Sequence, residues 1–201
     1  ITGIARAMVN WRSITDGEDR IAVGTHNHLY IIQDQALYDI TPLRDKSNDA
    51  TTTTEALDNS ETEIDLLSVA GFKTAGIVKI DSEIITYTGI SGLILHSTSA
   101  ATHDSGAVVT QILINPIATT DESTTITITD AAHGSRVGDF VAITGAAATG
   151  GITAENLNRK AGYQITAITT NTYTVTSPTA ATSTVSAGGG NAVALAYLIG
   201  I

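Results

Sequence analysis

Short runs of β-branched residues recur along the chain and constrain its fold more than any other feature. Val, Ile, Thr or Tyr occupies every position of Thr124–Thr129 and Thr172–Thr176. β-Branched side chains are stiff about χ1 and fit a pleated, half-buried surface better than a helix. We therefore expect an all-β chain of two or three small antiparallel β modules, each a meander, a sandwich or a small barrel, joined by polar linkers.

The composition limits both the core and the available chemistry. Only 4% of the 201 residues are aromatic, so small aliphatic side chains have to fill the core, which favours several small units. The chain has no cysteine, which excludes disulfides, thiolate nucleophiles and cysteine-ligated zinc. The formal net charge of −10 disfavours binding to nucleic-acid phosphates. No apolar run approaches the ~20 residues that a membrane-spanning helix needs.

The chain opens at Ile1 without a Met. No basic segment precedes an apolar stretch there, so we expect no signal peptide. The first residues have no feature of a natural start, and we expect the chain to be an internal piece of a longer polypeptide.

Residues 1–44 are expected to form a meander. Alternating residues predict strands over Arg20–Thr25, His28–Gln33 and Ala36–Ile40, with a turn at Asn27 and a tight hairpin at Asp34–Gln35. Such a meander resembles one blade of a propeller. A single blade cannot bury both of its faces, so it needs neighbours from the same polypeptide or from other subunits.

Residues 45–59 are expected to be a polar linker, because Asp45–Glu55 has no periodicity and little that packs. Two small β modules are expected after it, over residues 60–114 and 115–201. Their predicted strands are Glu63–Ser68, Gly76–Asp81, Glu83–Thr88, Leu93–His96, Ala107–Ile112, Thr124–Thr129, Asp139–Thr144, Tyr163–Ile168, Thr172–Thr176 and Ala192–Leu198. A helical turn is expected at Thr153–Leu157, with Thr153 as its N-cap.

His26 and His28 are weak candidates for a metal site. Two apart on an expected strand, their side chains point to one face, and two imidazoles at that spacing can share a metal. Only Asp34 and Asp39 offer a third ligand, and only if the hairpin folds back. A polar face beside a turn explains both histidines more simply, so we expect neither a metal nor a cofactor.

Other suggestive residues are explained by turns. His103–Ser105 contains the residue types of a catalytic triad, but adjacent residues on a turn cannot supply the geometry of a triad. We expect turns at His103 and at His133, with His133 bonded to a backbone carbonyl. Asp16–Asp19 lacks the ligand pattern of a calcium loop and predicts a solvated hairpin tip. No catalytic residue is assigned, and no enzymatic activity is expected.

Four residues are candidates for an interface with other proteins. Trp11 lies beside Arg12, and Trp and Arg are enriched in interface cores. Trp11 either anchors such an interface or seals a small core. Tyr30 and Tyr38 fall on neighbouring expected strands and predict a cross-strand aromatic pair.

Several stretches resemble structural proteins of tailed bacteriophages. The first segment resembles a stretch that recurs in the large β-rich tail proteins of short-tailed phages, of the nozzle or stabilisation type, at Ile4–Trp11, Arg20–His26, Leu29–Ile31 and Leu37–Pro42. Thr74–Gly89, with His103 and Gly106 following, looks similar to a small β module that is common in phage tail and baseplate proteins. Ala132–Val141 with Asn171–Val175 looks similar to a further module of this kind. The resemblance implies a virion structural role, cyclic assembly around the tail axis and no catalysis.

We therefore expect a virion protein of the tail that works by assembly. Exposed sheet edges and small apolar faces would pair with copies of the chain, in a cyclic homo-oligomer, and with other virion proteins. Three alternatives remain. They are a capsid decoration protein, a carbohydrate- or receptor-binding module that presents aromatics on one face, and a glycan-cleaving enzyme with two carboxylates ~5–10 Å apart across a groove.

Overall fold

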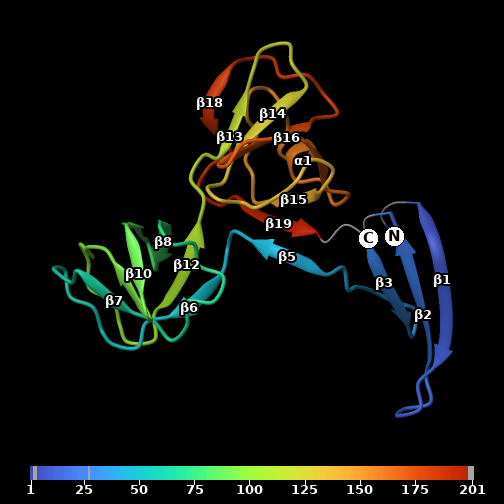
Figure 1. The fold of residues 1–201 in the computed structure, drawn as a ribbon, viewed down its shortest axis with the longest axis horizontal. Helices are drawn as coiled ribbons and strands as arrows, with labels where there is room; N and C mark the ends of the chain where they lie inside the picture. Colours follow the sequence, from blue (N-terminus) through green and yellow to red (C-terminus); the bar gives the residue numbers. More distant parts are fainter. Residues whose placement is uncertain (2–3, 27, 199–201) are drawn as a thin grey trace.

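The computed structural model describes residues 1, 4–26 and 28–198. Strands make up nearly all of its regular structure, which confirms the all-β prediction. Figure 1 shows three groups of strands: an N-terminal meander in dark blue, a middle module in cyan and green, and a third module that is yellow to red except for one light-blue strand, residues 43–46. None of the described sheets closes into a barrel. The turn predicted at Asn27 lies outside the described residues.

The N-terminal meander is an antiparallel sheet of four strands in chain order: β1 (Ala5–Arg12), β2 (Asp19–Thr25), β3 (Leu29–Gln33) and β4 (Ala36–Asp39). The hairpin predicted at Asp34–Gln35 is confirmed, with φ of +49° and +63°, as a type I′ turn requires. The strand β1 was not predicted. Its sequence does alternate, with Ala7, Val9 and Trp11 on one face and Met8, Asn10 and Arg12 on the other, so the pattern of a strand is present although all of its residues are exposed.

The middle module consists of two small antiparallel sheets around one apolar core. Ile64, Val78 and Leu95 are fully buried in this core. The first sheet has the order β6-β12-β8-β9 and the second the order β10-β11-β7. Their bounds are β6 (Ala50–Thr52), β7 (Glu63–Asp65), β8 (Gly76–Ile80), β9 (Glu83–Tyr87), β10 (Gly89–Ser91), β11 (Ile94–His96) and β12 (Val108–Ile112).

The third module is one eight-stranded antiparallel sheet that curls around the larger core, in the order β18-β13-β14-β17-β16-β15-β19-β5. Tyr173 and Tyr197 lie in this core among Ile and Val side chains. The strand bounds are β5 (Leu43–Lys46), β13 (Ile117–Thr119), β14 (Thr125–Thr129), β15 (Phe140–Thr144), β16 (Tyr163–Ile168), β17 (Thr172–Thr176), β18 (Val185–Gly188) and β19 (Ala194–Leu198).

A single helical turn, α1 (Ala154–Leu157), interrupts the strands of the third module, as predicted. The Thr153 side chain caps it by accepting a hydrogen bond from the Asn156 N–H at 3.2 Å. Among the described residues, no helix has the length and the apolarity that crossing a lipid bilayer demands.

Residues 45–59 do not behave as the plain linker that the sequence predicts. The strand β5 pairs with β19 at the edge of the third module, where Lys46 faces Ala196. The strand β6 pairs with β12 in the middle module, where Thr51 faces Val109. These polar residues become strands because open sheet edges lie beside them, a tertiary effect that local periodicity does not record.

Candidate functional site

The two faces of the N-terminal meander differ in what covers them. Residues opposite each other in an antiparallel sheet point to the same side. One row, which runs Val9–Ala22–Ile31–Tyr38, lies on what we call the outer face. The alternate row, Met8–Val23–Tyr30–Asp39, lies on the inner face. Val23 and Tyr30 of the inner face are 4% exposed, which shows that this face is the covered one.

A cavity of about 630 Å³ separates the inner face from the third module. Meander and third-module residues both line it, among them Tyr30, Leu37, Asp39, Ala142, Ile143 and Leu198. The meander therefore leans on the body of the molecule through this face.

The outer face is open and carries exposed apolar side chains beside the polar residues Arg20 and Gln33. Val9 is 61% exposed, Tyr38 52% and Trp11 39%. Ile31 is half-buried between them on β3. None of these residues belongs to either apolar core cluster of the described chain. Exposed apolar residues gathered on one sheet face are typical of a protein–protein contact surface.

The four predicted interface residues lie on both faces of the meander. Trp11 lies on the outer face, while Arg12, one residue on, lies on the inner side of β1 and donates from Nε to the Gly17 carbonyl at 2.7 Å. The cross-strand pair predicted for Tyr30 and Tyr38 is wrong. Tyr30 faces Asp39 and Tyr38 faces Ile31, so the two rings point to opposite sides of the sheet. The sequence places both on neighbouring strands but does not fix their register.

His26 and His28 occupy the connection between β2 and β3, not a strand as predicted. His26 accepts a hydrogen bond at Nδ1 from the Ile4 N–H at 3.2 Å. His28 is buried and stacks on Tyr30, with ring centroids 5.7 Å apart. Burial lowers the pKa of His28, nearby Asp39 opposes this, and His26 lowers it further. In the described part of the chain, no group of three or more His, Asp or Glu side chains is arranged so that it could hold a metal ion.

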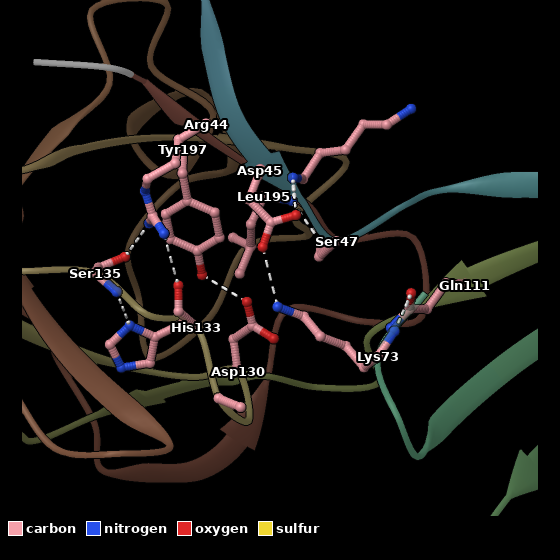
Figure 2. Close-up of polar contacts among 12 residues, drawn as sticks. Arg44, Asp45, Ser47, Lys73, Gln111, Asp130, His133, Ser135, Leu195 and Tyr197 are labelled. Carbon is pink, nitrogen blue, oxygen red and sulfur yellow. Dashed lines mark hydrogen bonds and ion pairs between the residues drawn. The ribbon is translucent and has the colours of Figure 1, made fainter. Parts of the chain in front are cut away.

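A connecting arm, residues 43–49, holds the third module against its neighbours. Figure 2 shows Arg44 of this arm beside Tyr197. The Arg44 guanidinium lies 5.0 Å from the centroid of the Tyr197 ring and donates to the His133 carbonyl at 3.1 Å and to Ser135 Oγ at 2.7 Å. A planar fork of donors suits such a site better than a lysine does.

His133 is bonded as the sequence predicts. Its Nε2 lies 3.0 Å from the Thr169 carbonyl oxygen, and its Nδ1 accepts the Ser135 N–H at 3.1 Å. The proton is therefore assigned to Nε2. The residue forms part of the turn and is not a free catalytic base.

Beneath Arg44, a buried chain of hydroxyls ends on a carboxylate. Tyr197 donates to Asp130 Oδ2 at 2.6 Å, and the Tyr173 hydroxyl oxygen lies 3.3 Å from that of Tyr197. Burial raises the pKa of both tyrosines well above the ordinary value. Both therefore stay protonated and serve as hydrogen-bonding groups in the core.

The same arm contacts the middle module. Asp45 Oδ2 lies 3.1 Å from Lys73 Nζ, and the Gln111 N–H donates to the Asp49 carbonyl at 2.8 Å. Ser47 binds the third module twice, donating its N–H to the Leu195 carbonyl and accepting the Leu195 N–H at Oγ, both at 2.9 Å. Figure 2 shows Asp45 of the arm with Lys73, and Ser47 of the arm beside Leu195. The arm thus ties the middle and third modules together.

One ionisable cluster was missed at the sequence level. His103 is buried, with Nδ1 2.8 Å from Asp81 Oδ2 and Nε2 2.7 Å from Glu83 Oε2. Glu83 also accepts from the Ala100 N–H and from Ser99 Oγ. The predicted turn at His103 is present, but its imidazole bridges two carboxylates from the β8–β9 hairpin, a contact that only the tertiary fold creates.

The contacts of the His103 cluster shift the pKa values of His103 and Glu83 in opposite directions. Burial lowers the pKa of His103, but the hydrogen bonds and charges of Asp81 and Glu83 outweigh it and leave the pKa raised. Burial raises the pKa of Glu83, while its bonds to His103, Ala100 and Ser99 outweigh it and leave it lowered. The cluster is an ion-paired clasp, with the imidazole filling the space between the two carboxylates.

Comparisons with known proteins add little. No protein-family model matches the chain, and no curated protein matches it. Among solved structures, the chain is similar to a chain described as "Phage phi92 endosialidase", with a TM-score of 0.35 and 17% sequence identity. The alignment covers 94% of this chain and 27% of that chain. A TM-score of 0.35 is too low for a shared fold to be inferred.

Proposed function

We propose that this chain is a structural component of the tail of a tailed bacteriophage and that it works through protein–protein contacts, without catalysis. The residues that resemble phage tail proteins support this function. The observation that carries it is the N-terminal meander, whose outer face exposes Val9, Trp11 and Tyr38 and whose two edge strands each pair with a strand on one side only among the described residues.

The meander has the properties of a unit completed by other chains. Both apolar core clusters of the described residues belong to the other two modules. The eight residues of β1 are all exposed, including Met8 and Val9. The outer edge of β1 pairs with no described strand, and an open strand edge with exposed apolar residues beside it invites association. Its presence favours an assembly protein over a module that acts alone.

The outer face suits a protein partner better than a sugar. Its two exposed aromatics, Trp11 and Tyr38, lie on the two opposite edge strands of the sheet. Three strand spacings separate those strands, about 14 Å. A sugar ring stacks on aromatics that lie close together, whereas an extended face with separated aromatics fits another sheet or strand.

Fractionated virions test this function. Purified particles of the encoding phage would be dissociated into capsids and tails, and each fraction would be analysed by mass spectrometry. We expect the chain in the tail fraction at a fixed ratio to the other tail proteins. Absence from virions would contradict the proposal, recovery with capsids alone would indicate a decoration protein, and specific binding on a glycan array would indicate a receptor-binding module.

A further inference from the structure

The two edges of the N-terminal meander carry opposite charges. The edge strand β1 contributes Arg6 and Arg12 and contains no acidic residue. The opposite edge, β4 with its preceding turn, contributes Asp34 and Asp39 and contains no basic residue. The charged residues of both edges are exposed. One edge therefore attracts the other, while each repels its own copy.

The number of strands makes the two edges compatible in direction. Each of the four strands is antiparallel to the next, so β1 and β4 run in opposite directions. A second copy placed beside the first in the same orientation would bring its β1 antiparallel to β4. The hydrogen-bond ladder would continue across the seam without turning any copy over.

From these observations we propose that the β4 edge of one copy pairs with the β1 edge of a second copy of this chain, head to tail. This inference rests on the assembly function proposed above and names its partner and its interface. Repetition of such a contact forms a ring when the rotation between copies closes.

One register of β4 against β1 of the second copy keeps the outer faces on the same side and brings opposite charges close together. Outer-face residues have to meet outer-face residues, which allows Tyr38 to lie opposite Trp11 of the second copy. Asp39 then lies opposite Asn10 and diagonal to Arg12, within reach of its guanidinium. The two aromatics that are remote within one copy become neighbours across the seam.

The alternative two-fold pairing is disfavoured by charge. Two β1 strands would bring Arg6 and Arg12 of both copies to one seam without an acidic residue. Two β4 strands would bring the two Asp39 carboxylates together. Like charges that face each other across an interface repel, and this repulsion suppresses the wrong pairing.

A charge-swap experiment on the full chain tests the interface. Sedimentation velocity at low salt would compare the unchanged chain, Arg12→Glu, Asp39→Arg and an equimolar mixture of the two variants. We expect each variant alone to associate about tenfold more weakly, or worse, and the mixture to recover association, because the swapped edges attract again. Recovery in the mixture also shows that both variants are folded.

Two further variants serve as controls. Lys79→Glu reverses an exposed charge on the middle module and should leave association unchanged. Asp39→Asn removes the charge but keeps an oxygen that can accept from the Thr41 N–H, as Asp39 Oδ1 does at 3.0 Å. It should give an intermediate effect.

Three results would overturn the inference. An unchanged chain that stays monomeric at the highest concentration excludes this contact between copies. An oligomer that neither charge variant weakens places the contact elsewhere, and loss of association in Arg12→Glu but not in Asp39→Arg excludes the β4 edge as the partner of β1. None of these results bears on the presence of the chain in tails, which the virion fractionation decides.

Discussion

The protonation state of His103 affects the stability of the middle module. Its imidazole lies between Asp81 and Glu83, and its pKa is raised while that of Glu83 is lowered. A group with a raised pKa stabilises the fold below its unfolded value and loses that contribution as the pH rises through the folded value. For Glu83 the contribution is present above its unfolded pKa and is lost as the pH falls through the lowered one.

The clasp should make stability depend on pH. We expect the free energy of unfolding to fall as the pH rises above about 6.5, the ordinary histidine pKa, because the folded chain holds the His103 proton more tightly than the unfolded chain does. His103→Gln should lower stability by about 1–3 kcal/mol at pH 6 and remove this slope. Urea unfolding followed by circular dichroism measures both. His96→Gln, at a histidine with a more open side chain, is the control, and a slope that survives His103→Gln would contradict the assignment.

Gly145 is a residue whose missing side chain matters. It has a φ of +71°, and a Cβ there would lie 2.0 Å from the Ala192 carbonyl oxygen. Gly92 has a φ of +63°, but a Cβ added there would meet no atom within 4 Å. Gly92→Ala should therefore cost about 1–2 kcal/mol for the left-handed backbone alone. Gly145→Ala should cost clearly more, and equal losses in thermal unfolding would show that the chain relaxes there.

At the scale of elements, β5 links the middle module to the third module. It supplies an edge to the third module through β19, and the arm that contains it reaches Lys73 of the middle module. Arg44 fixes this strand by two hydrogen bonds and by its contact with the Tyr197 ring. The arm is therefore held both by backbone pairing with β19 and by the side chain of Arg44.

Removal of the Arg44 side chain should loosen the arm. Arg44→Ala should destabilise the third module by about 1–3 kcal/mol, because the His133 carbonyl and Ser135 lose a charged donor. Arg44→Lys should recover only part of this, since a lysine lacks the planar fork. Hydrogen exchange of residues 43–49 measures the loosening. Arg136→Ala, at an exposed arginine of the same module, should leave exchange there unchanged.

Sequence reasoning predicts most of the longer alternating strands and misses short strands and strands at open edges. Glu83–Tyr87 and Thr172–Thr176 alternate clearly and form strands as predicted. The missed strands are short, contain glycine or line an open edge: β1, β5, β6, β10, β13 and β18. Such strands take their conformation from a neighbour in space. The residue type of Trp11 is enough to make it an interface candidate. The contacts of His103 with Asp81 and Glu83 exist only in the folded chain, so the sequence does not reveal them.

At the scale of the whole molecule, stability is unevenly distributed. The middle and third modules each have a buried apolar core, whereas the meander contributes no residue to either core cluster of the described chain. Segments with few buried apolar contacts open at lower free energy than segments in a core. The part of the molecule that we propose to meet a partner is thus also the part that is least stable on its own.

Hydrogen exchange of the dilute chain should reveal this gradient. We expect amides of β1 to exchange fastest and those of β8 and β14 to exchange slowest, because the latter strands carry Val78, Ile126 and Ile128, which are 0% exposed. At concentrations at which the chain associates, β1 should become protected. Protection of β1 equal to that of β14 in a dilute monomer would contradict this account.

The chain leaves the third module after residue 47 and re-enters it near residue 113, at neighbouring points. Ser47 bonds to Leu195, and Leu113 forms an isolated bridge to Val193, so the chain leaves and returns at nearly the same spot. Everything between these two points folds around a separate core. The middle module is thus a guest domain inserted into its host, and another compact domain could occupy the same gap while the host keeps its fold.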